Sequence, residues 1–131
     1  MEKFVISRET WLRGESDSES ALLRESDCKM CCLGFYLKDK GLTDDEIRGV
    51  ACPSDVRVDK TLPEWLLKKN PSGKTVDSDL CASLMEINDF QFDDDSPEYI
   101  STEGIFTDDV GREEVLKKLF AKAGVEVEFV D

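Results

Sequence analysis

The sequence predicts a single α+β domain in which several short helices pack on a small antiparallel sheet that includes the N- and C-terminal strands. Three observations favour this fold class. The length of 131 residues suits one domain with a continuous core. Both ends of the chain alternate apolar and polar residues, whereas apolar residues between them recur at helical spacing. No internal repeat or long linker divides the chain, so residues 1–131 are expected to form one domain.

The two ends of the chain have the pattern of strands. Residues 3–7 alternate over a short stretch, and residues 125–130 alternate more clearly. In the C-terminal segment Val125, Val127 and Phe129 share one face, and the two residues between them are glutamates. We therefore expect the two terminal strands to pair with each other.

The first half of the chain shows three helix signals. Met30, Leu33 and Leu37 recur at helical spacing in a segment that Gly41 ends. The tetrapeptide of residues 43–46 has the form of a capping box and predicts a short helix through residue 47. Residues 61–64 repeat that form, which predicts a brief helix over residues 65–67, before the turn residues 70–73.

Two further helices are expected in the second half. Ser78 is placed to cap a helix over residues 79–88. The last helix has one apolar stripe, and its basic residues near the C-terminal end suit the negative end of the helix dipole. Gly124 ends this helix. The stripe consists of Val115, Leu116, Leu119, Phe120 and Ala123.

Composition excludes several classes of function. The chain has no histidine, which removes the commonest general base and the nucleophile pairs that use it, and we expect a protein without catalytic activity or cofactor. The net charge of −13 disfavours direct binding to nucleic acid, and the charge favours a basic partner instead. The sequence has no apolar run long enough to span a bilayer and no secretion signal at its start. The chain is therefore expected in the cytoplasm and off the membrane.

The cysteines allow three interpretations. Cys28 and Cys31 form one C-x-x-C pair, and Cys52 and Cys81 would complete a zinc site if the fold brought them together. The second interpretation is that Cys31 and its neighbour pack as small apolar residues on a helix. The third is a redox switch.

A second group of candidate residues favours an anionic small ligand. Trp11, Arg13, Arg24 and Lys29 lie in or beside a stretch rich in serine and acidic residues. Arginine offers bidentate contacts to an anion and tryptophan offers a stacking surface, so a metabolite or nucleotide is a ligand that these residues suit. The alternative is that the charged residues form solvated ion pairs.

The stretch from residue 75 to residue 111 contains eleven acidic residues and no lysine or arginine. Six large apolar residues are interleaved with them, and we expect some of the aromatic rings to pack beneath the acids. Such a surface would attract a basic protein groove, as a nucleic-acid mimic does. The alternative is that the charge only keeps the protein soluble. The candidate partner-binding residues are Asp89, Asp93, Asp94, Asp95 and Glu98.

Five segments spread over most of the length carry a resemblance to known proteins, and they are Trp11–Glu15, Ala21–Arg24, Lys29–Phe35, Ile87–Asp89 and Leu119–Phe129. In these segments the chain resembles small bacteriophage-encoded accessory proteins that have no assigned activity. The resemblance implies an accessory protein that binds and inhibits a bacterial host or defence protein, in the manner of a DNA mimic or an anti-CRISPR-like inhibitor. It also implies the cytoplasm of the bacterial host cell as the location.

Overall fold

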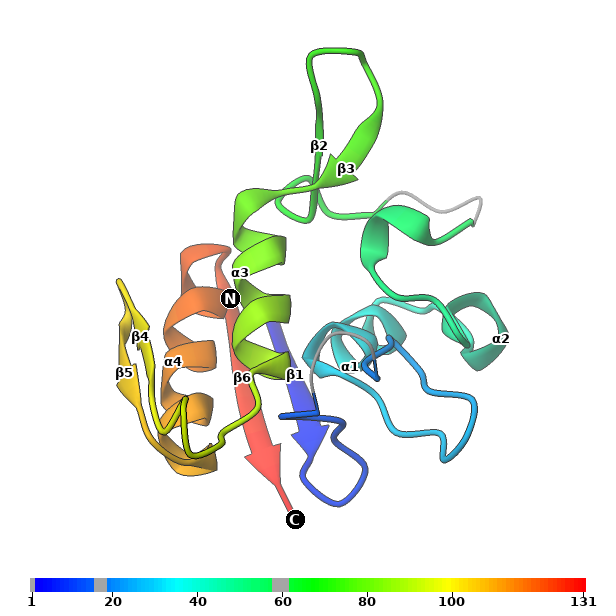
Figure 1. The fold of residues 1–131 in the computed structure, drawn as a ribbon. Coiled ribbons are helices and arrows are strands. Elements are labelled where there is room, and N and C mark those ends of the chain that lie inside the picture. Colours follow the sequence, from blue (N-terminus) through cyan, green and yellow to red (C-terminus); the bar gives the residue numbers. More distant parts are fainter. Residues whose placement is uncertain (1, 16–18, 58–61) are drawn as a thin grey trace.

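The computed structural model describes residues 2–15, 19–57 and 62–131 (Figure 1). Three sheets of two strands each and four α-helices are found in these residues. No described helix is both long enough and apolar enough to cross a membrane. The elements in chain order are β1 (Glu2–Ser7), α1 (Cys32–Asp39), α2 (Asp44–Ile47), the 3-10 helix η1 (Pro53–Asp55), β2 (Leu67–Lys69), β3 (Thr75–Asp77), α3 (Asp79–Asp89), β4 (Tyr99–Ser101), β5 (Gly104–Phe106), α4 (Asp109–Lys122) and β6 (Val125–Val130).

The terminal strands pair, but the antiparallel sheet predicted for them is wrong. β1 and β6 run parallel, in a register that matches Glu2 with Val125 and Ser7 with Val130. Parallel strands need a long crossover, and all four α-helices lie in the chain between these two strands. Apolar alternation places residues on a face in either strand direction, so it carried no information about direction. The other two sheets are the separate antiparallel hairpins β2–β3 and β4–β5.

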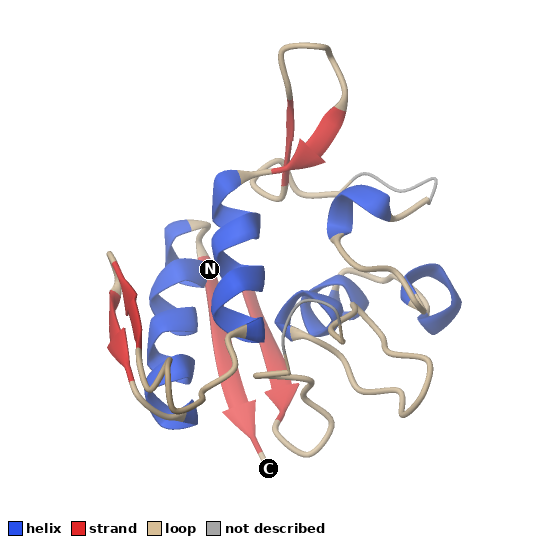
Figure 2. Ribbon diagram, in the orientation of Figure 1, coloured by secondary structure: helices blue, strands red, loops and turns tan. Residues whose placement is uncertain are grey.

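Helices α1, α3 and α4 cover one face of the β1–β6 sheet, and α2 lies away from it (Figure 2). α4 lies on the β6 side, α1 lies on the β1 side, and α3 lies between these two helices (Figure 1). The face toward the helices is buried, and the Phe4 ring meets Tyr36 and Phe120 edge-on with centroids 5.3 and 5.0 Å away. The opposite face, with Lys3 and the glutamates of β6, is exposed.

Most of the predicted helix boundaries are confirmed. Thr43 and Glu46 form the capping box of α2, with both reciprocal hydrogen bonds present. The Ser78 hydroxyl caps α3 by accepting the backbone N–H of Cys81 at 3.0 Å. Gly124 follows α4 with φ +75°, a backbone conformation that favours glycine.

The brief helix predicted over residues 65–67 is wrong. A turn precedes Leu67, which begins β2, and Thr61 of the proposed cap lies outside the described residues. The turn predicted at residues 70–73 is confirmed, because the Asn70 side chain accepts the backbone N–H groups of Ser72 and Lys74 at 3.0 and 2.9 Å. That turn closes the β2–β3 hairpin. Strand pairing with β3 outweighed the local helix signal.

Candidate functional site

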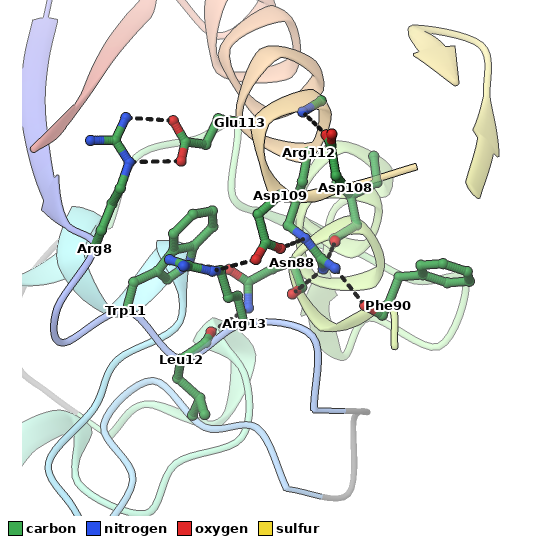
Figure 3. Close-up of polar contacts among 12 residues, drawn as sticks. Arg8, Trp11, Leu12, Arg13, Asn88, Phe90, Asp108, Asp109, Arg112 and Glu113 are labelled. Carbon is green, nitrogen blue, oxygen red and sulfur yellow. Dashed lines mark hydrogen bonds and ion pairs between the residues drawn. The ribbon is translucent and has the colours of Figure 1, made fainter. Parts of the chain in front are cut away.

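A buried asparagine at the end of α3 joins three parts of the chain (Figure 3). The Asn88 Oδ1 atom accepts the Trp11 indole N–H at 2.8 Å and the Cys32 backbone N–H at 3.0 Å. Its amide nitrogen donates to the Leu12 carbonyl and to the Asp89 carboxylate, both at 2.9 Å. The full hydrogen-bonding capacity of this amide is therefore used to hold the N-terminal loop and α1 against α3.

Arg112 of α4 closes the C-terminal end of α3 (Figure 3). Its guanidinium donates to the carbonyls of Ile87 and Asn88 at 2.8 Å and of Phe90 at 2.7 Å, and it forms an ion pair with Asp109 at 3.2 Å. The residue is only 1% exposed. Burial lowers the pKa of Arg112, which the negative charge of Asp109 opposes. A helix C-terminus attracts a cation, and here the cation comes from another helix.

Neither Asn88 nor Arg112 was proposed as a site residue from the sequence. One signal was available for Asn88, because it follows Leu84 by four residues and so continues the apolar face of its helix. Arg112 is the first basic residue after the acidic stretch, yet nothing in its spacing distinguishes a buried arginine from an exposed one. The N-terminal loop and α1 meet at Asn88, since Trp11, Leu12 and Cys32 all contact it.

The residues proposed for an anionic ligand have structural partners. Trp11 is buried and bonded to Asn88, and the guanidinium of Arg13 lies 4.6 Å from the Trp11 ring centroid. Arg13 also pairs with Asp109 at 3.1 Å. These contacts give Trp11 and Arg13 a role in packing the N-terminal loop against α3 and α4, and they do not support the ligand prediction.

The other two members of that group belong to an adjacent turn. Arg24 pairs with Asp27 at 2.6 Å and with Glu15 at 3.3 Å, and its guanidinium lowers the pKa of Asp27 to about 2. The backbone N–H of Lys29 donates to the same Asp27 carboxylate. Neither Trp11, Arg13, Arg24 nor Lys29 lines any of the three cavities described below. The ion-pair interpretation therefore accounts for Arg24.

The four cysteines proposed for zinc do not form a metal site in the described part of the chain. Cys31 and Cys81 are buried, Cys52 is half-buried and Cys28 is exposed on a turn with φ +61°. Among residues 2–15, 19–57 and 62–131, no group of three or more metal-binding side chains is placed to hold a metal ion. Burial raises the pKa of Cys31 to about 12, which makes it a poor nucleophile.

These environments predict a single reactive thiol. When the folded protein is treated with iodoacetamide at pH 8, we expect Cys28 to be alkylated first, because it is exposed while Cys31, Cys32 and Cys81 are buried. Peptide mass spectrometry after short exposures measures the order of labelling, and the same reaction in urea serves as the control for full access. Labelling of Cys81 as fast as Cys28 would contradict the structure.

The five proposed partner-binding acids occupy two environments. Asp89 is half-buried at the end of α3, whereas the other four lie in the loop that leads to β4. The Asp93 carboxylate accepts the backbone N–H groups of Asp95 and Ser96, so this residue shapes the turn. The carboxylates of Asp94, Asp95 and Glu98 are exposed and have no hydrogen bond or ion pair with any described residue.

Aromatic rings support this loop from beneath, as predicted. The rings of Phe90, Phe92, Tyr99 and Phe106 contact one another with centroids 5.0 to 6.1 Å apart. The Arg112 guanidinium lies against two of them, 5.2 Å from the Phe92 centroid and 5.3 Å from that of Phe106. Because Arg112 also caps α3, the acidic loop is held by the same side chain as the helix before it.

Two of the apolar residues interleaved with the acids do not pack in the interior. Ile100 and Ile105 are 69% and 60% exposed. They face each other across the β4–β5 hairpin, at the edge of the molecule beside α4 (Figure 1). We call Asp94, Asp95, Glu98, Ile100 and Ile105 the acidic face.

A cavity of about 840 Å³ adjoins the acidic face. Asp77, Glu86 and Asp89 line it, Phe90 and Tyr99 line it too, and no lysine or arginine does among the residues that the structure describes. The Glu86 carboxylate accepts the Tyr99 hydroxyl at 2.7 Å. Asp89 is thus part of a negatively charged cavity next to the loop that carries the other four acids. A second cavity lies along β6, and a third lies along β1.

Comparison with known proteins does not place this chain in a family. No protein-family model matches it, and neither a curated protein nor a solved structure matches it.

Proposed function

We propose that this chain is a non-enzymatic accessory protein that binds a basic surface of a bacterial protein through the acidic face. The observation that supports this function best is that three carboxylates without an ion-pair partner among the described residues come shortly before two exposed isoleucines in the chain. Asp94, Asp95 and Glu98 carry the charge, and the hairpin next to them exposes Ile100 and Ile105.

Neighbouring acidic residues, unlike those of the acidic face, form ion pairs with basic residues. Glu103 at the tip of the hairpin pairs with Lys122, and Asp109 pairs with two arginines. Nothing among the described residues neutralises Asp94, Asp95 or Glu98 in this way. The carboxylates of the adjoining cavity add to the same negative potential. A concentrated potential of one sign steers an oppositely charged partner toward that surface and raises the rate of association.

The two isoleucines supply apolar surface that a partner could bury on binding, which charge alone does not provide. Interfaces between proteins combine a desolvated apolar centre with a polar rim, and surface charges contribute little affinity in water. Ile100 and Ile105 lie opposite each other in register, so they form one apolar spot beside the carboxylates. The rings beneath the loop and the capped turn at Asp93 fix this surface before binding, which limits the entropy lost on association.

The resemblance to phage proteins suggests the class of partner. A basic groove that handles nucleic acid, such as that of a host or defence complex in the bacterial cytoplasm, has the charge that complements the acidic face. Occupation of such a groove blocks it without any catalytic step. Inhibition by occupation is therefore the mechanism that we propose.

We predict that the variant Asp94→Asn/Asp95→Asn/Glu98→Gln loses the partner. Bacterial lysate is passed over immobilised wild-type protein and over this variant in parallel, and the retained proteins are identified by mass spectrometry. We expect a basic protein that the wild type retains and the variant does not. With that protein purified, the variant should bind at least about tenfold more weakly and with a flatter dependence on salt, because charge steers the encounter.

The matched control removes three charges elsewhere. Glu9, Glu25 and Glu64 are exposed, and their replacement by glutamine gives the same net charge as the test variant. The control variant should retain the partner. If both variants retain the same proteins with the same affinity, the acidic face is not the binding surface. If both lose the partner equally, the overall charge of the chain and not this face attracts it.

A further inference from the structure

Strand β6 has one edge that is not paired with another described strand. In the described residues β6 pairs only with β1. The Val130 carbonyl accepts the Arg8 N–H at 2.7 Å on the β1 side, and peptide groups of a strand alternate between its two edges. The backbone groups of Val125, Val127 and Phe129 therefore point to the free edge. Such an edge is a template for pairing with another chain.

A groove of about 490 Å³ runs along this edge. Residues 125–129 of β6 line it, together with Lys117 and Ala121 of α4 and Lys3 of β1. The groove follows from the widths of the two layers. Strands lie about 5 Å apart and packed helices about 8–10 Å apart, so a row of three helices is wider than two strands. α4 consequently extends beyond β6 (Figure 1).

The size of the overhang favours a single extended segment as the occupant. A strand added at the free edge would lie beneath α4 and would pair with Val125, Val127 and Phe129. A second copy of this chain does not suit the edge, because its own helices would meet α4 if the two sheets joined. Self-pairing would also bring Glu126 or Glu128 opposite a glutamate of the other copy, and like charges opposite each other destabilise a sheet.

Charge identifies the kind of segment. Glu126 and Glu128 lie on the exposed face of β6, with side chains 58% and 52% exposed. Among the described residues, Lys3 is the one cation that pairs with both, its Nζ atom lying 3.8 Å from Glu126 and 3.3 Å from Glu128, and a single charge cannot neutralise two carboxylates. Opposite these glutamates, an added strand would gain from lysine or arginine at alternate positions. Its other side chains would face Ala121 and the aliphatic stem of Lys117, which suits apolar residues.

We infer that β6 is a docking edge for an extended segment of a partner protein that alternates basic and apolar residues. The groove beside β1 is a weaker candidate, because Lys38 and Asp39 line it and offer no charge of one sign. The inference is independent of the acidic face, since no residue is shared between the two surfaces.

The test uses a blocked hexapeptide of alternating lysine and valine and the isotope-labelled protein. Titration should shift the amide NMR signals of Val125, Val127 and Phe129, and saturating peptide should slow hydrogen exchange at these amides at least about tenfold, because they become hydrogen-bonded. A peptide of the same sequence with alternate backbone amides N-methylated keeps the charge and loses the donors. It should neither shift nor protect these amides.

A charge exchange provides the second measurement. The variant Glu126→Lys/Glu128→Lys should lose the lysine peptide and bind a hexapeptide of alternating glutamate and valine. The inference is overturned if the N-methylated peptide binds as well, or if the shifts map only to residues 93–100. It is equally overturned if the β6 amides become protected as protein concentration rises without peptide, since that result would identify a second copy as the occupant. The peptide comparison on the wild type decides the question even if the variant does not fold.

Discussion

Replacing Arg112 with methionine is expected to lower the free energy of unfolding by about 3 kcal/mol, which is a large fraction of the stability of a small domain. The methionine fills similar space but donates no hydrogen bond. The carbonyls of Ile87, Asn88 and Phe90 would then be buried without this donor. The Asn88 carbonyl would keep the Gly14 N–H as a donor, so the unpaired carbonyls of Ile87 and Phe90 account for most of the expected loss. Urea denaturation of wild type and variant at pH 7 measures it.

Arg48→Met is the matched control for this prediction. Arg48 is exposed and pairs with Asp45 within the same turn of chain, so its replacement should change the free energy of unfolding by less than about 1 kcal/mol. If Arg112→Met lowered the free energy of unfolding by no more than this control does, the contacts of Arg112 with the end of α3 would contribute little to stability. Because Arg112 also lies against the rings beneath the acidic loop, its variant should in addition bind the partner of the acidic face more weakly.

Replacing Gly34 with alanine should also destabilise the protein by about 3 kcal/mol or more, although alanine is the better helix former. Gly34 lies in α1, and a Cβ atom there would be only 1.9 Å from the Leu22 carbonyl oxygen. The obstacle is backbone, so no side-chain rotation relieves it. The added methyl group would push α1 away from the segment that contains Leu22. Thermal and urea denaturation are the measurements.

The control for this prediction is Ala82→Gly in α3. Ala82 is exposed on a helix, so this exchange reports the ordinary difference between the two residues, about 1 kcal/mol in favour of alanine. Alanine should therefore be the less stabilising residue at position 34 and the more stabilising residue at position 82. A Gly34→Ala variant as stable as the wild type would mean that α1 does not approach Leu22 as closely as the structure shows.

The acidic stretch shows how far a sequence argument reaches toward a site. Composition located it and predicted that rings would lie beneath it, and the cluster around Phe90 confirms this. Composition could not rank the acids. The Asp93 carboxylate accepts backbone N–H groups of its own turn, Glu103 pairs with Lys122, and Asp94 has no side-chain partner among the residues that the structure describes. The choice among them depends on which residues from distant parts of the chain come within reach.

The sequence by itself determined the local features of this protein. These features could be predicted because each depends on residues a few positions apart in the chain. They are the helix caps at Thr43 and Ser78, the end of α4 at Gly124 and the alternation of the terminal strands. Tertiary structure alone decided the direction of the β1–β6 pair, the burial of Asn88 and Arg112 and the free edge of β6. These features depend on contacts between segments far apart in the chain, and local periodicity is the same whichever way such segments meet.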